Sequence, residues 1–462
     1  MNTPFSGWSM GFLYGIFLRR GSPRRVPPRE KFLHGAASVR WAAPVVCIGL
    51  AVTLLSACGD PKQGDPVGTV AQSSDPVPSG PHLYCIVNVG QTLTTFSLDD
   101  RKVLPGTARI LDLDPVGPWF DDTSGDGFYL ARVDGSGAGA NALIKFDPKT
   151  TIELARLKFP PNSNPNQMLI LPTHPGMAWV ALKGATFDNF ATNGLSVVNL
   201  STMTDEAFCD LNAATDTCDP LAPDQGGDLT SLLGFYWDAG GCGGAGCAYA
   251  VVGNFNGSVR EGWLLVLSVD VDGKPVFQDA IRLGRNPRLE MVVDGGGELW
   301  VVNNGGFVHF GDEGAPGTLQ VLNTSLFANG AAGDRTLATI SVAGDPASCD
   351  SPPSPDPGCD PTGIYSHQSP GGLSAWVTTY PDDVLRTVNL TTNALNVLDT
   401  GLPEVTGPFF SVQKPTAALF AGLNGFGQAR LGEIDPATGA KLAEYDLQAG
   451  QGPVSCAEFD TP

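Results

Sequence analysis

The sequence predicts an all-β protein: a single seven-bladed β-propeller of four-stranded antiparallel blades. Glycine and proline are abundant, with 58 and 38 residues among 462, and only 16% of the residues are charged. This composition favours short strands and turns over amphipathic helices. A unit containing an aromatic-led strand also recurs seven times, at spacings typical of propeller blades.

The aromatic-led strand is the most regular part of the repeat. Its copies are LYCIVN (83–88), FYLARV (128–133), AWVALK (178–183), AYAVVG (248–253), LWVVNN (299–304), AWVTTY (375–380) and LFAGLN (419–424). The following strand ends on turn formers, as in FDPKT, VNLST and IDPATG, which favours a hairpin to a fourth strand. The aligned aromatic residues are expected to pack between blades, and a sugar-binding cage is the alternative.

A further strand precedes six of the seven aromatic strands, and a proline opens five of the six. The six are GPWF (117–120), NPNQMLIL (164–171), DLTSLLGFYWD (228–238), NPRLEMVV (286–293), DPTGIY (360–365) and GPFFSV (407–412). LYCIVN has none, but the chain ends on GPVSCAEFD (452–460), which has the same pattern. We expect this C-terminal strand to join the N-terminal blade and close the ring, because an open ring leaves two bare sheet edges. A six-bladed ring and a pair of β-sandwiches are the alternatives.

The repeat resembles the YVTN-type family of seven-bladed propellers, a WD40-like arrangement, over residues 81–462. LWVVNN and IDPATG are similar to that family's strand and turn motifs. Several long insertions depart from the family pattern. The resemblance therefore implies a blade number and does not imply a function.

The first 57 residues are predicted to be a basic leader and a lipoprotein signal peptide. Seven Lys and Arg residues against one Glu lead into the apolar run WAAPVVCIGLAVTLLSA (41–57), which suits a signal peptide better than a membrane span. Leu55-Ser56-Ala57-Cys58 resembles the lipobox of bacterial lipoproteins. The resemblance implies that Cys58 becomes the lipidated, palmitate-carrying first residue, and Gly59 after it implies the outer membrane. An ordinary signal peptide or an uncleaved anchor is the alternative.

The rest of the chain divides into a tether and the propeller. Residues 58–80 are rich in Gly, Pro, Ser and Asp and are predicted to be flexible, before the propeller at 81–462. Subtracting the leader leaves 27 − 7 = 20 basic and 47 − 1 = 46 acidic residues. This acidic balance argues against binding to nucleic acid. We expect a monomer on the cell envelope, held at the membrane by its lipid, with envelope proteins or glycans as partners.

Eight cysteines remain after Cys47 in the signal peptide and Cys58, which permits four disulfides in an oxidising compartment. Three pairs are local: Cys209–Cys218, Cys242–Cys247 and Cys349–Cys359. The remaining two, Cys85 and Cys456, lie on strands that we expect to be neighbours in the closed ring. Their bond is predicted to contribute on the order of 5 kcal/mol, against ~3 kcal/mol for each short loop. A metal site in CGGAGC (242–247) is the alternative, but zinc requires further ligands and no histidine is close.

Three short motifs were tested for chemistry. GWSMG (7–11) matches a nucleophile elbow, but it lies in the leader. GCGGAG (241–246) matches a dinucleotide loop but lacks a surrounding βαβ unit. Asp122, Ser124 and Asp126 match the start of a calcium loop, although position twelve is Val133 in place of Glu. We favour a hairpin turn there, because turn composition explains every residue.

A ligand is expected at the face where the loops between second and third strands, and those from each fourth strand to the next first strand, meet the channel of the ring. The candidate residues are Asn88, Arg132, Asn254, Asn303, Asn304, His309, Asp382 and Asn424. The histidines fall in different loops, so no catalytic residues and no cofactor beyond the weak calcium candidate are predicted. We expect a non-catalytic binding or scaffold module. A lactonase-like hydrolase using the channel mouth is the alternative, because related propellers include such enzymes.

Overall fold

The computed structural model describes most of the chain from Pro76 onward. The described residues are 76–112, 114–132, 141–185, 189–221, 231–253, 261–293, 297–305, 317–327, 335–342, 360–369, 372–380, 384–389, 392–399, 401–402, 405–413, 418–423 and 428–462. No helix among them is both long and apolar enough to cross a membrane. The predicted leader, Cys58 and most of the predicted tether lie outside these residues.

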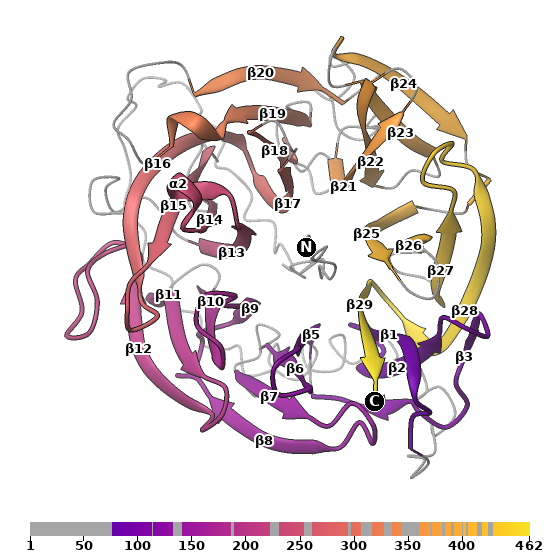
Figure 1. Cartoon of the computed structure of the whole chain (residues 1–462), viewed down its shortest axis with the longest axis horizontal. Helices are drawn as coiled ribbons and strands as arrows, with labels where there is room; N and C mark the ends of the chain where they lie inside the picture. Colours follow the sequence, from indigo (N-terminus) through magenta and orange to yellow (C-terminus); the bar gives the residue numbers. More distant parts are fainter. Residues whose placement is uncertain are drawn as a thin grey trace, which may run out of the picture. The chain divides into compact units, whose positions relative to one another are not determined.

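Seven antiparallel sheets stand side by side in a ring, as Figure 1 shows. Blade one contains β29 (Val454–Thr461), β1 (Gly80–Val87), β2 (Thr92–Ser97) and β3 (Lys102–Val103), with β4 (Arg109–Ile110) also paired to β2. Blade two contains β5 (Pro115–Asp121), β6 (Asp126–Ala131), β7 (Ala142–Phe146) and β8 (Glu153–Lys158), and blade three β9 (Pro165–Ile170), β10 (Met177–Ala185), β11 (Asn189–Asn199) and β12 (Thr204–Asp210).

The other four blades follow the same order. Blade four contains β13 (Ser231–Asp238), β14 (Cys247–Gly253), β15 (Glu261–Val269) and β16 (Pro275–Arg285), and blade five β17 (Pro287–Val293), β18 (Glu298–Asn303), β19 (Thr318–Asn323) and β20 (Thr336–Ser341). Blade six contains β21 (Asp360–Ser369), β22 (Gly372–Tyr380), β23 (Val384–Asn389) and β24 (Ala394–Asp399), and blade seven β25 (Val405–Val412), β26 (Ala418–Leu423), β27 (Gln428–Ile434) and β28 (Lys441–Gln451). The seven-bladed prediction is therefore confirmed, and the six-bladed and sandwich alternatives are excluded.

The C-terminal strand closes the ring as predicted. β29 pairs antiparallel with β1 over its whole length, from Gly80 opposite Thr461 to Val87 opposite Val454. Cys85 lies directly opposite Cys456, with 4.1 Å between their Cα atoms, and the two form a disulfide. Strands from the two ends of the domain thus share one sheet, which removes the two bare edges of an open ring.

The repeated aromatic residues pack between blades, and three of them also donate a hydrogen bond to the next blade. The indole N–H of Trp179 donates to the carbonyl oxygen of Gly273 at 2.7 Å, and Trp376 donates to Pro436 at 3.2 Å. The Tyr84 hydroxyl donates to the carbonyl of Pro148 at 2.9 Å. Each acceptor lies in the turn between the third and fourth strands of the following blade. The prediction of inter-blade packing is confirmed, and in these three residues the polar atom of the ring adds a directional contact to the next blade.

The Tyr84 hydroxyl is expected to stabilise the closure of the ring. It also shares a 2.7 Å hydrogen bond with Oγ1 of Thr461, so it joins blade one, its closing strand and blade two. Tyr84→Phe should lower the free energy of unfolding by roughly 1–3 kcal/mol, because the buried carbonyl of Pro148 loses its donor and the Thr461 hydroxyl loses a hydrogen-bond partner. Urea unfolding of Tyr84→Phe, Thr461→Val and the double variant measures the coupling between them. Strictly additive losses would contradict a shared hydrogen bond.

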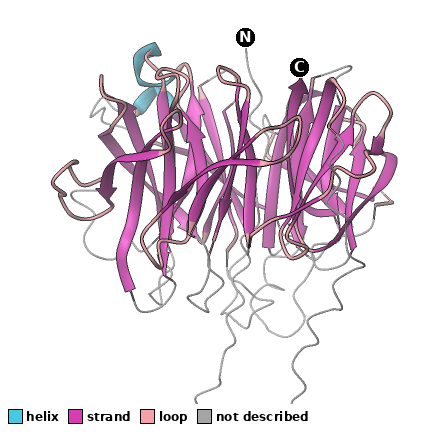
Figure 2. Cartoon of the chain, turned by 90° about the horizontal axis from the view of Figure 1, so that it is seen from below, coloured by secondary structure: helices cyan, strands magenta, loops and turns pink. Residues whose placement is uncertain are grey.

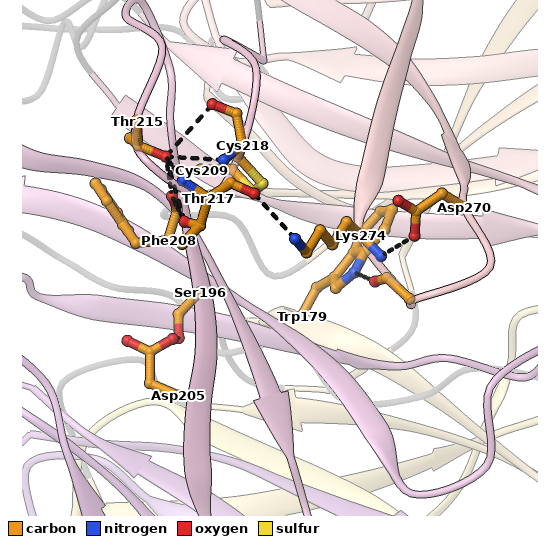
Figure 3. Close-up of a disulfide and its surroundings, with 11 residues drawn as sticks. Trp179, Ser196, Asp205, Phe208, Cys209, Thr215, Thr217, Cys218, Asp270 and Lys274 are labelled. Carbon is orange, nitrogen blue, oxygen red and sulfur yellow. Dashed lines mark hydrogen bonds between the residues drawn. A yellow bond between two sulfur atoms is a disulfide. The ribbon is translucent and has the colours of Figure 1, made fainter.

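Two of the predicted short-loop disulfides are present, Cys209–Cys218 and Cys242–Cys247. Figure 3 shows the first, which joins Cys209 in β12 to Cys218 in the loop that follows. In this loop the carbonyl of Thr217 accepts a hydrogen bond from the ammonium group of Lys274 in blade four at 3.1 Å. This disulfide loop therefore contacts the neighbouring blade. The predicted pair Cys349–Cys359 lies outside the described residues.

The described chain begins before the predicted start of the propeller. Val77, within the predicted tether, is buried in the cluster that contains Tyr84 and Phe146 of blades one and two. Its N–H donates to the carbonyl of Lys149 at 2.6 Å. The last residues of this segment therefore pack on the ring.

Candidate functional site

Each face of the ring carries a different set of strand ends and connecting loops. Figure 2 shows α2 (Gly241–Gly244), which connects β13 to β14, on the same face as the C-terminus. The opposite face, hereafter the lower face, carries the ends of the second strands and the starts of the inner strands. This is the face on which the sequence placed a ligand.

A chain of hydrogen bonds crosses four blades at the lower face. The side-chain amide of Asn88, after β1, donates to Oδ1 of Asp114, just before β5. Nη2 of Arg132, after β6, donates to the same oxygen at 2.7 Å, and Nη1 donates to Oδ1 of Asn166 in β9 at 3.0 Å. The amide of Asn166 then donates to the carbonyl of Leu233 in β13. Arg132 is only 3% exposed, whereas the Asp114 side chain is 27% exposed, so solvent reaches this ion pair from the carboxylate side.

Lys183 lies near the end of β10, one blade further round the ring from Arg132. Its side chain is buried, and its backbone N–H donates to the carbonyl of Asn164 at 3.2 Å. Burial first, and then the charge of Arg132, lower the pKa of the Lys183 ammonium, which is about 7 when all its neighbours act together. Asp114 raises this pKa, whereas Arg288 of blade five lowers it. Lys183 therefore holds both the amine and the ammonium form near neutral pH.

Blade five adds polar groups on the same face. Asn286, between β16 and β17, has a φ of 49° and donates through its amide to the carbonyl of Gly305. Asn303, at the end of β18, donates to Oε1 of Gln320 at 3.3 Å. The amide oxygens of Asn286 and Asn303 are buried and accept no hydrogen bond from the described residues.

Several arginine Nε atoms at the lower face are also buried and make no hydrogen bond within the described part of the chain, and three of these lie in or beside blades two, four and five. They belong to Arg132, Arg285 and Arg288. Buried polar atoms are almost always satisfied by protein, water or a ligand. A group of such atoms within one region therefore marks a candidate binding site.

The structure describes four of the eight candidate ligand residues. Asn88 and Arg132 belong to one hydrogen-bonded chain, while Asn303 and Asn304 are both buried in blade five. The other four, Asn254, His309, Asp382 and Asn424, lie outside the described residues. The binding role of all eight stays a prediction.

Sequence reasoning did not identify Asp114, Asn166, Lys183 or Arg288. Two signals were present in the sequence. Lys183 is the one charged residue of the otherwise apolar strand AWVALK, and Asn166 and Arg288 each follow the proline that opens an inner strand. A polar residue at the end of a buried strand requires a partner or a function.

The calcium candidate is a hairpin turn between β5 and β6. Oδ1 of Asp121 accepts from the N–H of Thr123 at 3.0 Å, and Oγ of Ser124 accepts from the N–H of Asp126 at 3.3 Å. Asp126 forms a 2.6 Å ion pair with Lys145. Within the described residues, no three His, Cys, Asp or Glu side chains are grouped to hold a metal ion. Asp122, Ser124 and Asp126 therefore fit the turn interpretation.

Comparison with known proteins identifies the fold and not a family. No protein-family model matches the chain, and no curated protein matches its sequence. Similar solved structures include a protein of unknown function from Desulfotomaculum acetoxidans, with 11% identity, a TM-score of 0.52 and coverage of 82% of this chain and 99% of that one. A provisionally assigned 6-phosphogluconolactonase from Bacteroides fragilis has 11% identity, a TM-score of 0.50 and coverage of 82% and 98%.

A third similar structure is dihydro-heme d1 dehydrogenase NirN, with 13% identity and a TM-score of 0.48. The alignment covers 79% of this chain, which spans 63% of the length of that protein. At these identities the likenesses show a shared propeller architecture alone.

Proposed function

We propose that the protein is a lipoprotein of the bacterial outer membrane, whose YVTN-type propeller binds a small polar ligand without catalysis. The hydrogen-bonded chain from Asn88 to Leu233, with unsatisfied buried atoms beside it, is the observation that carries the binding function. The lipobox-like segment and the tether support membrane anchoring. The disulfides support an oxidising compartment. Envelope proteins or glycans are the proposed partners of a monomeric ring.

Cys58→Ser is expected to release the protein from the membrane. The substitution removes the thiol that carries the lipid, and no stable anchoring follows without acyl chains. The measurement is membrane fractionation of cells that express the full chain, together with incorporation of a labelled fatty acid. Cys47→Ser, within the signal peptide, is the matched control and should remain lipidated and membrane-bound. Membrane retention of Cys58→Ser would show an uncleaved anchor instead.

A lactonase-like hydrolase is the second candidate function. Lys183 and Asp114 bring an amine and a carboxylate to one site, and amines with lowered pKa values are suited to acid–base chemistry at neutral pH. Two neighbours in fold also bear the name 6-phosphogluconolactonase. Asp114, however, already accepts from Asn88 and Arg132, which favours a structural role for this carboxylate. Lactone hydrolysis that disappears in Lys183→Met would favour the hydrolase over the binding module.

A further inference from the structure

Three large apolar side chains are exposed on the outer rim of blades one and two. They are Ile110 in β4, Ile152 just before β8, and Leu154 in β8, with exposed fractions of 58%, 55% and 54%. Nine large apolar side chains are exposed among the described residues, so a third of them belong to this area. We call these three residues the rim patch. Because β8 is the outermost strand of blade two, the patch lies on the rim of the ring and not at its channel (Figure 1).

Hydrogen bonds between the two blades hold the rim patch together. Nε of Arg109, the residue before Ile110, donates to Oγ1 of Thr151 at 2.6 Å. Nη2 of Arg156 in β8 donates to Oδ2 of Asp112, just after β4, at 2.8 Å. β4 and the residues after it therefore run beside β8, and the three apolar side chains share one area of the rim. Apolar side chains grouped in this way mark a contact with a protein or a membrane.

A β-bulge in the outer strand exposes Leu154. Glu153 and Ala155 pair with adjacent residues of β7, so Leu154 is the extra residue, and a bulge redirects such a side chain. Leu337 and Leu442 occupy the corresponding bulges of blades five and seven, where they are 51% and 60% exposed. A bulged leucine alone therefore marks no contact, and the surroundings of Leu154 decide whether it makes one.

The first described residues of the chain are attached next to the rim patch. The N–H of Val77 donates to the carbonyl of Lys149 at 2.6 Å, in the hairpin that ends at Ile152. Residues 59–76 separate this point from Cys58, the predicted lipid site. A flexible chain of this length has a root-mean-square extent of about 23 Å. A lipid on Cys58 therefore keeps the membrane surface within reach of the patch.

The charges around the rim patch also suit a membrane surface. The chain after the leader contains 20 basic and 46 acidic residues. Near the patch, residues 109–112 and 147–158 hold as many basic as acidic residues and one more: Arg109, Lys149, Arg156 and Lys158 against Asp112, Asp147 and Glu153. Lys149 and Lys158 are exposed. Anionic lipid headgroups therefore meet no excess of negative charge here, in contrast to the domain as a whole.

We propose that the rim patch rests on the lipid surface of the membrane that holds the anchor, with its three apolar side chains among the headgroups. This inference rests on the proposed lipoprotein function and adds the surface by which the ring meets the membrane. Burial of apolar side chains together with attraction to anionic lipids is the usual basis of such contacts. The rim then faces the membrane, and the lower face stays open to a ligand.

Hydroxyl-radical footprinting of the lipidated full-length protein tests the proposal. The protein is bound to vesicles of phosphatidylethanolamine and phosphatidylglycerol and compared with Cys58→Ser, which is free in solution. Radicals oxidise exposed leucine and isoleucine side chains, and mass spectrometry locates the products. We expect oxidation of the rim patch to fall by about threefold or more on the vesicles. Leu337 and Leu442, exposed to a similar degree on other blades, are internal controls and should be oxidised equally in both samples.

Paired variants test whether the apolar side chains themselves make the contact. Ile152→Ser with Leu154→Ser, in the lipidated protein on vesicles, should return the oxidation of Ile110 to its level in solution. Leu337→Ser with Leu442→Ser is the matched control and should leave the rim patch protected. Thermal unfolding shows whether each variant is folded. Footprinting of the wild type tests the proposal even where a variant is not folded.

Three results would overturn the inference and leave the proposed anchoring intact. One is unchanged oxidation of the rim patch in a protein that incorporates labelled fatty acid and stays on the vesicles. Another is protection of the patch in Cys58→Ser that grows with protein concentration, which assigns the patch to a second copy of the chain. The third is protection in membranes from cells but not on lipid vesicles, which assigns it to a protein partner. Absence of fatty acid from the wild type would overturn the proposed lipoprotein function and this inference with it.

Discussion

Replacing Cys85 and Cys456 together by alanine is expected to lower the free energy of unfolding by about 5 kcal/mol. The disulfide joins residues 371 positions apart, so it restricts nearly the whole unfolded domain. In the chain-entropy model, the stabilisation by a cross-link grows with the logarithm of the loop that it closes. Urea unfolding of the wild type and the double variant, both under non-reducing conditions, measures the loss.

The matched control is the double variant Cys209→Ala with Cys218→Ala, whose disulfide spans only nine positions. It should lose about 3 kcal/mol or less, since the loop it closes is short. Equal losses from the two double variants would contradict the chain-entropy explanation of the stabilisation. Hydrogen exchange adds a second readout, because loss of the Cys85–Cys456 bond should increase opening of β1 and β29 specifically.

The closure could be predicted because it follows from counting strands. Six inner strands were available for seven aromatic strands, and a ring of blades requires the missing one. GPVSCAEFD was the one segment left with the right pattern, and β29 begins at Val454 within it. The pairing of Cys85 with Cys456 then followed from the register of two neighbouring strands. Each step used a regularity that repeats along the chain.

The site depends on features that do not repeat. Arg132 and Lys183 occupy the fifth and sixth positions of their aligned aromatic strands, and adjacent positions of a strand point to opposite faces. The direction of these two side chains can therefore be predicted only when the position of each strand end is known to within one residue. The position of Arg288 relative to Lys183 further depends on the angles between three blades. Local sequence patterns carry no such information.

Lys183→Met is expected to raise the free energy of unfolding at neutral pH, on the order of 3 kcal/mol. Burial holds the pKa of Lys183 near 7 in the folded protein, whereas the unfolded chain has the ordinary lysine value of 10.5. At and below pH 7 the folded state must accommodate a buried ammonium group next to Arg132. Methionine has a similar length and carries no charge, so it removes this cost.

The pH dependence of the free energy of unfolding tests independently whether Lys183→Met is stabilising. Between pH 7 and about 10 the unfolded chain keeps a proton that the folded protein has released, so the wild type gains stability as the pH rises. The free energy of unfolding of Lys183→Met should therefore exceed that of the wild type most at pH 6–7, and the difference should shrink towards pH 10. Urea unfolding of both proteins at four pH values across this range measures it, in the absence of any anionic ligand.

The outcome of Lys183→Met separates a structural lysine from a binding lysine. Lys145→Met, which breaks a 2.6 Å ion pair with Asp126, should lower stability slightly. A loss of stability in Lys183→Met at every pH would mean that this lysine supports the blade contacts. A gain in stability together with loss of ligand binding would show that Lys183 lowers the stability of the folded protein while it contributes to the proposed binding function. That combination is the trade-off expected of a functional site.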